Sequence, residues 1–279
     1  MPFHTRPFPN CRCDADISDA HRHHPVFVRL LTLARDLRRR KARERHGLFV
    51  AEGVRTVEEL LRSPVETRGL LATAALSDDA RGAALLAAAR EAGVAVATVD
   101  EASFATAADT DSPQGVLAVG VVPPRALADL PTPAGVRLLV LDALQDPGNV
   151  GTILRTAAAF GVAATVALPG TVDLWNAKVV RSAMGAHFRH PTVSSTAAEL
   201  ASFLAARGVA LWGADMGGAP LGAHPPPARL ALAVGNEGAG LSAEVRAAAA
   251  QLVAIPIVAE VESLNAAVAA GILLHALRA

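Results

Sequence analysis

The sequence predicts an α/β protein in which a smaller α/β unit precedes a larger one with a mostly parallel sheet. Short apolar runs typical of buried strands alternate with helical patterns after residue 24. A Pro-rich segment, residues 123–135, divides this alternation in two and is predicted to be a linker. In the second half, three polar loops interrupt apolar runs. We therefore expect a disordered tail over residues 1–24, a first domain over 25–122 and a second domain over 136–279.

The composition fits folded domains and argues against several classes of protein. The 279 residues are 52% hydrophobic and 19% charged, with a formal net charge of +0. Such a chain can bury a core, and it has no overall field that would attract polyanions. Nucleic-acid binding would therefore need a local basic patch. No apolar run approaches the roughly 18 residues of a membrane span, so we expect a cytoplasmic protein without a membrane segment.

The first 24 residues have charges, Pro and His where a signal peptide would have an apolar stretch, which predicts a disordered tail. Both cysteines of the chain, Cys11 and Cys13, lie here. Together with His21, His23 and His24 they could form a metal cluster, but their spacing fits no structural zinc pattern. We expect neither a metal site nor a structural disulfide.

The first domain is predicted to open with a helix from Pro25 to about Arg45, because apolar residues recur there at helical spacing. Alternating strands and helices follow. The predicted strands are GLFVAEG, TRGLLAT, VAVATV and GVLAVGVV, and the predicted helices between them are VRTVEELLRS, SDDARGAALLAAAREAG and DEASFATAA.

The second half of the first predicted helix is strongly basic. A basic cluster of this kind is a candidate contact for an RNA backbone. The alternative interpretation is a charged face that only contacts water. The side chains that we assign to RNA binding are Arg38, Arg39, Arg40, Lys41 and Arg43.

The second domain opens with the buried-strand pattern RLLVLDAL and continues with strict alternation. Further strands are predicted in VAATVALPG, HPTVSS, VALWGADM, LALAVGN and QLVAIPI, and helices in VGTILRTAAAFG, LWNAKVVRSAMGAHF, TAAELASFLAARG, SAEVRAAAA and the C-terminal segment. In parallel sheets of this type, ligands bind outside the carboxyl ends of the strands. The three polar loops all fall at such ends, which predicts one shared site.

The first polar loop, Asp146 to Gly151, combines Pro and Gly in a tight turn. Asn149 could cap the helix that follows. Arg155 lies one to two turns into this helix, where its guanidinium could point toward a phosphate or a carboxylate. The alternative interpretation is a structural turn with a surface arginine.

The second polar loop runs from Gly235 to Gly240 and follows a strand. Its glycines are spaced G-x-x-G-x-G, whereas a dinucleotide-binding loop has G-x-G-x-x-G, and the chain has no P-loop motif. A nicotinamide cofactor and a P-loop nucleotide are therefore disfavoured. The loop does offer bare backbone that can approach a flat ligand closely, and Glu237 could accept a hydrogen bond from an amine, a hydroxyl or an arginine.

The third polar loop, Glu262 to Asn265, lies between the strand end at Ile255 and the last helix. Ser263 is predicted to be the N-cap of this helix. Polar groups held between two apolar elements must satisfy one another or bind a ligand. The helix itself is too apolar for a surface position and is predicted to be a core or interface helix.

The three loops together resemble a known family. D-P-x-N-x-G-x-x-x-R-x-A-x-A-F-G, then G-N-E-G-x-G-L-S, then I-P-I-x-x-x-x-E-S-L-N-x-x-V-A-A-G-I-L-L resemble the three signature motifs of the SpoU class of SPOUT RNA 2′-O-ribose methyltransferases. RKARERHGLFVAEGVRTVEELL and TDSPQGVLAV look like the substrate-binding domain of the ribosomal-RNA branch of that class.

The resemblance implies a SPOUT domain with a trefoil knot, a homodimer, and S-adenosylmethionine as the cofactor. It implies a first domain similar to small ribosomal RNA-binding α/β folds, with structured RNA, and ribosomal RNA first, as the substrate. The positions that match the functional residues of the family are Asn149, Arg155, Glu237, Ser263 and Asn265. The positions that would hold the cofactor are Gly235, Asn236, Gly238, Ile255, Leu264 and Asn265.

Two other functions belong to the same fold. One is a transfer-RNA methyltransferase, which is disfavoured because such enzymes often lack this N-terminal domain. The other is an RNA-binding or ribosome-assembly protein without methyl transfer. The intact Asn149, Arg155, Glu237 and Asn265 favour an enzyme, and a 23S ribosomal RNA ribose is the expected methyl acceptor.

Overall fold

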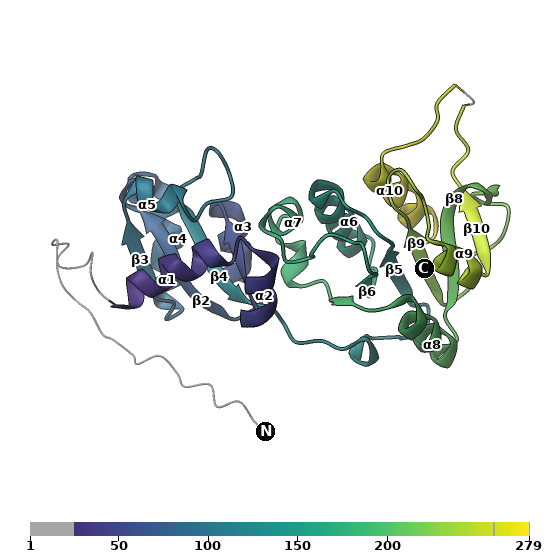
Figure 1. The fold of residues 1–279 in the computed structure, drawn as a ribbon, viewed down its shortest axis with the longest axis horizontal. Coiled ribbons are helices and arrows are strands. Elements are labelled where there is room, and N and C mark those ends of the chain that lie inside the picture. The colour runs from purple at the N-terminus through teal and green to yellow at the C-terminus, as the bar shows by residue number, and fades with distance from the viewer. Residues whose placement is uncertain (1–24, 259, 279) are drawn as a thin grey trace.

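The structure is a computed structural model that describes residues 25–258 and 260–278. The predicted tail, with its cysteines and histidines, lies outside the described residues. Two α/β units lie side by side, the first purple to blue and the second green to yellow (Figure 1). Each has its own sheet, and the segment between the sheets holds only the short 3₁₀ helix η3, Leu127–Asp129, among its described residues.

The first unit is built on a mixed four-stranded sheet of order β1-β4-β2-β3. β4 runs antiparallel to β1 and β2, whereas β2 and β3 are parallel. The strands are β1 (Leu48–Glu52), β2 (Thr67–Thr73), β3 (Val96–Val99) and β4 (Val116–Val121). The helices are α1 (Pro25–Asp36), α2 (Arg40–His46), α3 (Val54–Leu61), α4 (Ala80–Glu91) and α5 (Glu101–Ala105), with the 3₁₀ helix η2 at Ala74–Asp78.

The helix predicted from Pro25 to Arg45 is divided into α1 and α2 by a turn at residues 37–39. A side-chain contact holds the turn. The Arg43 guanidinium donates to the carbonyls of Leu37 and Arg38, at 2.7 and 2.9 Å, so it satisfies two backbone groups that the helix would otherwise use. Arg39, the residue before α2, is extended.

The second unit confirms the predicted parallel sheet: its six strands have the order β10-β8-β9-β5-β6-β7, and every neighbouring pair is parallel. The strands are β5 (Arg137–Leu141), β6 (Ala164–Ala167), β7 (Thr192–Ser194), β8 (Ala210–Pro220), β9 (Leu230–Val234) and β10 (Gln251–Ala254). The helices are α6 (Pro147–Ala159), α7 (Ala177–Ser182), α8 (Ala197–Arg207), α9 (Ala243–Ala248) and α10 (Ala266–Ala276), with the 3₁₀ helix η4 at Ala186–Phe188. After β5 the chain places β6 and β7 on one side of it and then β8, β9 and β10 on the other. The strand order therefore changes direction between β5 and β9, which flank a switch point of the sheet.

Two predicted helix caps are wrong. The last helix starts after Asn265, whose side-chain oxygen accepts from the backbone N–H groups of Ala267 and Val268, and Ser263 lies before it in the loop. The helix α6, which follows the start of the first polar loop, is capped by Asp146 and not by Asn149. The Asp146 carboxylate accepts from the backbone N–H of Asn149 at 2.7 Å. In both places the Asn or Asp directly before the helix makes the capping bond that the sequence pattern assigned to another residue.

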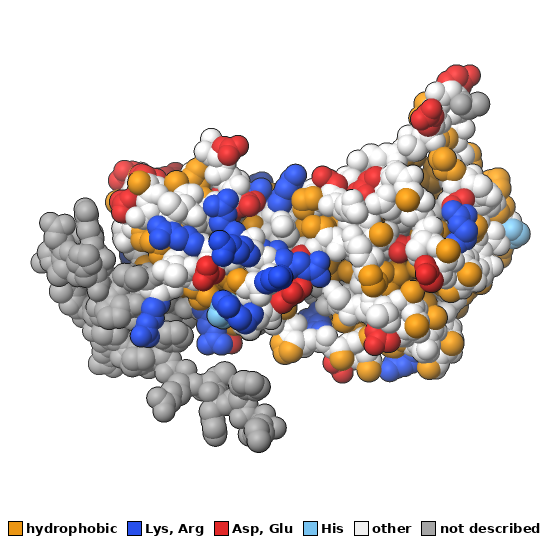
Figure 2. Space-filling view, in the orientation of Figure 1, with side chains coloured by type: hydrophobic (Ala, Val, Ile, Leu, Met, Phe, Trp, Pro, Cys, Tyr) orange, Lys and Arg blue, Asp and Glu red, His pale blue; other side chains and the backbone are white. Residues whose placement is uncertain are grey.

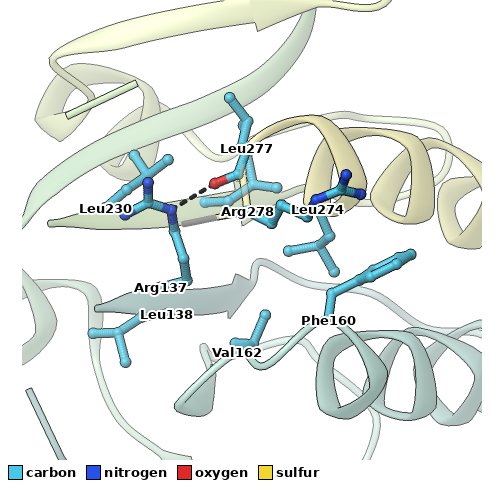
Figure 3. Close-up of a pocket in the computed structure, with 9 residues that line it drawn as sticks. Arg137, Leu138, Phe160, Val162, Leu230, Leu274, Leu277 and Arg278 are labelled. Atoms are coloured by element: carbon cyan, nitrogen blue, oxygen red, sulfur yellow. Dashed lines mark hydrogen bonds between the residues drawn. The ribbon is translucent and has the colours of Figure 1, made fainter. Parts of the chain in front are cut away.

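The amino end of the second sheet is closed by Arg137 (Figure 3). Its guanidinium donates to the carbonyl of Leu277, at 2.5 Å, and to that of Ala228, at 2.8 Å. These bonds hold the end of α10 against the start of β5 and of β9. The small apolar pocket beside them, lined by Phe160 and Leu274 among others, lies at the opposite strand ends from the polar loops.

The two units share a packed interface. The Phe49 ring of β1 lies 4.5 Å from the Trp175 ring and 5.8 Å from the Phe188 ring, centroid to centroid. Val180 and Phe188 of the second unit belong to the same buried cluster as the core of the first. The apolar contact therefore continues from one sheet to the other, and the first unit is docked on α7 and η4.

A buried ion pair crosses the same interface. Arg43 Nη2 and Asp173 Oδ2 are 2.6 Å apart, and their side chains are 6% and 17% exposed. Arg189 and Glu59 form a second pair across the units, at 2.8 Å, with side chains 46% and 35% exposed. Because Arg43 also holds the α1–α2 turn, it ties that turn to the second unit.

We expect Arg43→Ala to lower the free energy of unfolding by about 3–5 kcal/mol, because Asp173 would lose its counter-charge inside the interface. The matched control, Arg189→Ala, removes an exposed interdomain pair and should cost less than about 1 kcal/mol. Urea unfolding followed by circular dichroism measures both. Equal losses for the two variants would contradict a special role for Arg43.

Candidate functional site

The three polar loops meet at the carboxyl ends of β5 and β9. The Asn265 amide donates to Asn149 Oδ1 at 3.0 Å, and the Asn149 amide donates to Glu237 Oε1 at 3.2 Å. One residue from each loop thus forms a chain of hydrogen bonds, across separations of 116 and 88 residues in sequence. This convergence is the arrangement that the sequence predicted.

The first loop is held from both sides. The Glu237 carboxylate faces the backbone N–H groups of Gln145 and Asp146, at 3.4 and 3.3 Å. Ala143 adopts a left-handed conformation with φ 57°, which costs a residue with a Cβ roughly 1 kcal/mol. Its carbonyl accepts from the Asn236 amide at 2.9 Å, and this bond helps to keep the strained backbone in place.

Asp142 is a site residue that the sequence analysis did not identify. Its side chain is buried at the end of β5, and its Oδ2 accepts from the backbone N–H of Ser242 at 2.7 Å. It therefore joins the first loop to the helix start that follows the second loop. A carboxylate directly after the buried run RLLVL was the signal available in the sequence, since such a group needs a partner.

The second loop is shaped by Asn236 and its glycines. Asn236 Oδ1 accepts from the backbone N–H groups of Gly238 and Ala239, both at 2.9 Å. A Cβ on Gly235 would lie 2.3 Å from the Gly240 carbonyl carbon, so only glycine fits there. On Gly240 a Cβ would meet nothing within 4 Å. The loop is thus packed on one side and presents bare backbone on the other.

Gly151, in the first motif, serves helix packing. A Cβ at this position would lie 2.5 Å from the Ser182 Cβ and 2.6 Å from the Val179 carbonyl oxygen. The close approach of α6 to α7 therefore requires glycine. Because α7 also contacts the first unit, α6 connects the polar loops with the interdomain interface.

The charge of Glu237 is stabilised where it lies. Burial alone would raise its pKa, but hydrogen bonds from its own backbone, from the Asn149 amide and from the backbone of Gln145 and Asp146 outweigh burial and lower the pKa. The carboxylate is an anion at neutral pH and acts as the acceptor at the end of the chain.

Comparisons with known proteins agree with this geometry. A model described as the SpoU rRNA Methylase family matches residues 137–275, and one described as the MRM3-like substrate binding domain matches residues 32–118. The chain is 37% identical over 243 residues to the 23S rRNA (guanosine(2553)-2′-O)-methyltransferase RlmP of Bacillus subtilis, covering 87% of this chain and 93% of that protein.

This chain belongs to the SpoU rRNA methylase family.

Two solved structures of relatives have the same fold. An AdoMet-bound rRNA methyltransferase from Sinorhizobium meliloti is 28% identical, with a TM-score of 0.78, over 89% of this chain and 93% of that one. The SpoU methyltransferase AviRb from Streptomyces viridochromogenes, in complex with the cofactor AdoMet, is 26% identical, with a TM-score of 0.80, over 89% and 96%. The predicted family and α/β fold are confirmed.

Of the remaining residues matched to the SpoU motifs, two lie apart from the hydrogen-bonded chain. Arg155 is exposed on α6 and has no hydrogen-bond or ion-pair partner among the residues that the structure describes. Six helical positions separate it from Asn149, which places it about 120° around the helix. Ser263 is exposed in the third loop and makes no hydrogen bond within the described part of the chain.

The residues expected to hold the cofactor come from the second loop and from the segment between β10 and α10. Gly238 is exposed, Gly235 and Asn236 shape the loop, and Ile255 is half-buried against the core of the second unit. Leu264 is half-buried beside Asn265. Bare backbone next to apolar side chains suits a flat heterocycle with polar edges, so these residues fit the adenosyl group that the family implies.

The predicted RNA-binding residues lie on the α1–α2 turn and on α2. Lys and Arg side chains gather over these elements on the face that Figure 2 shows. Four of them are exposed: Arg38, Arg39, Arg40 and Lys41. Arg43 is 5% exposed and is committed to Asp173 and to two carbonyls, so the structure gives it a positioning role at the interface.

The described residues contain no group of three or more His, Cys, Asp or Glu side chains that could hold a metal ion. Among the same residues, no helix has both the length and the apolar character needed to span a bilayer.

We expect Glu237→Gln to destabilise the protein at pH 7 by less than about 1 kcal/mol, because the group is exposed. A lowered pKa contributes stability above the ordinary value of 4.5 and loses that contribution as the pH falls through the lowered value. The difference between wild type and variant should therefore shrink below about pH 4.5. Urea unfolding between pH 7 and pH 3.5 measures this difference, with Glu91→Gln, at the end of α4, as the control. A difference in the free energy of unfolding that does not change with pH would contradict a stabilised Glu237 anion.

Proposed function

We propose that this protein transfers a methyl group from S-adenosylmethionine to the 2′-hydroxyl of a ribose in 23S ribosomal RNA. The observation that carries the proposal is the Asn265–Asn149–Glu237 chain, which joins three loops outside the carboxyl ends of β5 and β9. The family membership and the relatives described above, of which two were solved with AdoMet, support the cofactor and the ribosomal substrate.

We assign the cofactor to the open side of the second loop. Gly235, Asn236, Gly238, Ile255, Leu264 and Asn265 would hold it. When bound, S-adenosylmethionine supplies an electrophilic methyl group on a sulfonium. The third loop would pass through the rest of the domain as a trefoil knot, which keeps its backbone close to the second loop.

The polar residues orient the acceptor. Glu237 fixes the Asn149 amide through one hydrogen bond, and Asn265 fixes its oxygen through another, so neither end of Asn149 can rotate freely. A ribose hydroxyl brought to this chain finds both donors and acceptors at set positions, which favours in-line attack. Ser263 adds a hydroxyl at the rim for the ribose or for the methionine end of the cofactor.

Arg155 is assigned to the charge that develops on the acceptor oxygen. Its guanidinium has a pKa far above neutral and is a poor base. It can hold the phosphate next to the target ribose and stabilise the developing alkoxide, while the phosphate or a water molecule takes the proton. RNA is selected over DNA because the reacting group is itself the 2′-hydroxyl.

We also propose a homodimer whose interface includes α10 and the third loop. Val268 and Ile272 are one helical turn apart on α10 and are 52% and 39% exposed, while Val258 of the loop is 65% exposed. Exposed apolar side chains that adjoin one another mark an interaction surface. α10 packs on α6, where a Cβ on Gly271 would lie 3.7 Å from Thr156. The exposed Arg155 next to Thr156 would then face the partner subunit. The enzyme that we propose is thus a cytoplasmic dimer that acts on ribosomal RNA.

The test is transfer of a radiolabelled methyl group from S-adenosylmethionine to purified 23S ribosomal RNA. The label should appear in ribose, in a nucleoside with an alkali-resistant 3′ bond. Label on transfer RNA alone would move the substrate to the transfer-RNA branch. No label on any ribosomal or transfer RNA would leave a protein that binds RNA without methylating it.

We expect Arg155→Ala to reduce single-turnover methyl transfer by about 10²–10³-fold, the usual effect of losing one donor at a developing oxyanion. Cofactor affinity should stay within a few-fold of wild type, because Arg155 lies outside the loops assigned to the cofactor. Isothermal titration calorimetry measures that affinity. Lost cofactor binding would reassign Arg155 to the cofactor site.

We expect Val268→Glu combined with Ile272→Glu to convert a dimer into a monomer in size-exclusion chromatography with light scattering, because two charges would enter an apolar interface. Met216→Glu, at an apolar side chain of β8 that is 72% exposed, is the control and should remain dimeric. A monomeric wild type at about 50 μM, or a dimeric double variant, would contradict the interface.

A further inference from the structure

A groove lies between the two units and has a part in neither the hydrogen-bonded chain nor the assigned cofactor site. Its volume is about 710 Å³, within the usual range of ligand pockets. One wall comes from α2 and the first linker residues, and the other from the segments that follow β6 and β7. The lining includes Arg40, Arg125, Thr171, Ser194 and Ser195.

The floor of the groove is bonded to the end of β5 and to the segment that leads into the first polar loop. The Thr171 hydroxyl donates to the Leu141 carbonyl at 2.9 Å, and the Val172 backbone N–H donates to the Leu144 carbonyl at 2.8 Å. Gln145 and Asp146, which face Glu237, follow directly in the chain. The floor of the groove is therefore joined to the segment that leads into the hydrogen-bonded chain.

The carboxylates that line the groove each have a partner. Asp173 pairs with Arg43 at 2.6 Å, and Glu44 pairs with Arg40 at 2.7 Å. Glu199 turns to the start of α8, where it accepts from the Thr196 backbone and from the hydroxyls of Thr196 and Ser195.

Arg125 is the groove cation that takes part in none of these ion pairs. It is exposed and makes no hydrogen bond or ion pair with any residue that the structure describes. Two histidines lie within its electrostatic reach, and burial lowers the pKa of His187 to about 3 and that of His190 to about 4. Both are neutral at pH 7 and add no charge. The groove is therefore positive at Arg125, and the exposed Arg40 can exchange its surface pair for another anion.

The aromatic content of the groove indicates what kind of contact it makes. Trp175 is the aromatic residue among those that line it, and its ring is packed against Phe49 and His187, at centroid distances of 4.5 and 4.0 Å. No ring in the described lining is free to stack on a base. Guanidinium and hydroxyl groups can bind phosphates and sugars, and such backbone contacts position a nucleic acid without reading its sequence.

We propose that this interdomain groove binds the ribose–phosphate backbone of the single-stranded RNA next to the target nucleotide, with Arg125 and Arg40 on phosphates and Ser194 and Thr192 near the sugars. The proposal rests on the proposed function. It assigns Arg125, a linker residue, to the substrate and explains why the α1–α2 turn is fixed to the second unit by Arg43. RNA bound on the turn, in the groove and at Asn149 would follow one continuous path.

The test measures binding of a fluorescent 23S ribosomal RNA transcript by anisotropy at several salt concentrations. Arg125→Glu should weaken binding at least tenfold and should lower the slope of log affinity against log salt by about 0.7–1, the value of one phosphate contact. Arg90→Glu, an equal charge change on the exposed end of α4, is the control and should weaken binding less than twofold. Ser194→Trp should fill the groove and weaken binding at least tenfold, whereas Ser202→Trp on α8 should not.

Calorimetry with S-adenosylmethionine checks that each variant is folded, and cofactor affinity should be unchanged. Equal weakening by Arg125→Glu and Arg90→Glu would show only a long-range charge effect and would overturn the proposal. So would full RNA affinity of Ser194→Trp. Because binding is measured without methyl transfer, a wild type that binds the transcript but methylates none would refute the proposed function separately.

Discussion

The two hydrogen bonds of Asn149 are the interaction on which the rest of the site depends. Its side-chain oxygen accepts from Asn265 and its amide donates to Glu237, so the chain has one direction. An aspartate there would repel Glu237, and an apolar residue would remove one hydrogen bond from each partner. The backbone of Asn149 is in turn fixed by Asp146, which caps α6. A single amide thus sets the relative position of three loops that are far apart in the sequence.

The same carboxyl edge carries the connection to the first unit. Thr171 bonds the end of β5, Asp173 two residues later binds Arg43, and Arg43 holds the turn that presents the basic side chains. The aromatic contact of Phe49 with Trp175 closes the interface from the apolar side. A flexible linker would leave the substrate domain free to turn. Here the buried pair and the shared core give it one orientation, so the distance from the basic α1–α2 turn to Asn149 is a property of the fold.

The sequence predicted the parallel sheet and the meeting of the polar loops because both follow from local patterns and one general rule, that ligands bind at carboxyl ends. It missed what long-range contacts decide. The basic helix reads as continuous, yet Arg43 bonds the carbonyls at its centre and splits it. The same burial removes Arg43 from the surface that its neighbours form. Ser263 has good capping chemistry, but Asn265 is held by Asn149 and caps the helix from there. The burial of Arg43 and the cap at Asn265 each depend on a partner more than 100 residues away, Asp173 or Asn149, which a pattern that spans only a few residues does not reveal.

The segment from Ile255 to Asn265 contains the third polar loop. It is fixed at Asn265 and packed at Ile255, and between these points it carries exposed apolar side chains. Ile257, Val258 and Val261 are 37%, 65% and 44% exposed. Fully burying one such side chain stabilises by roughly 1.5–3 kcal/mol, so a cofactor or a partner subunit that covers this loop gains a driving force that the isolated protomer does not use. Arg155, exposed on α6, is likewise outside the chain within one protomer. In the proposed dimer, the groups assigned to the acceptor would be preformed within one protomer. Arg155 would join them only when the loop and α10 are covered, and this would couple chemistry to assembly.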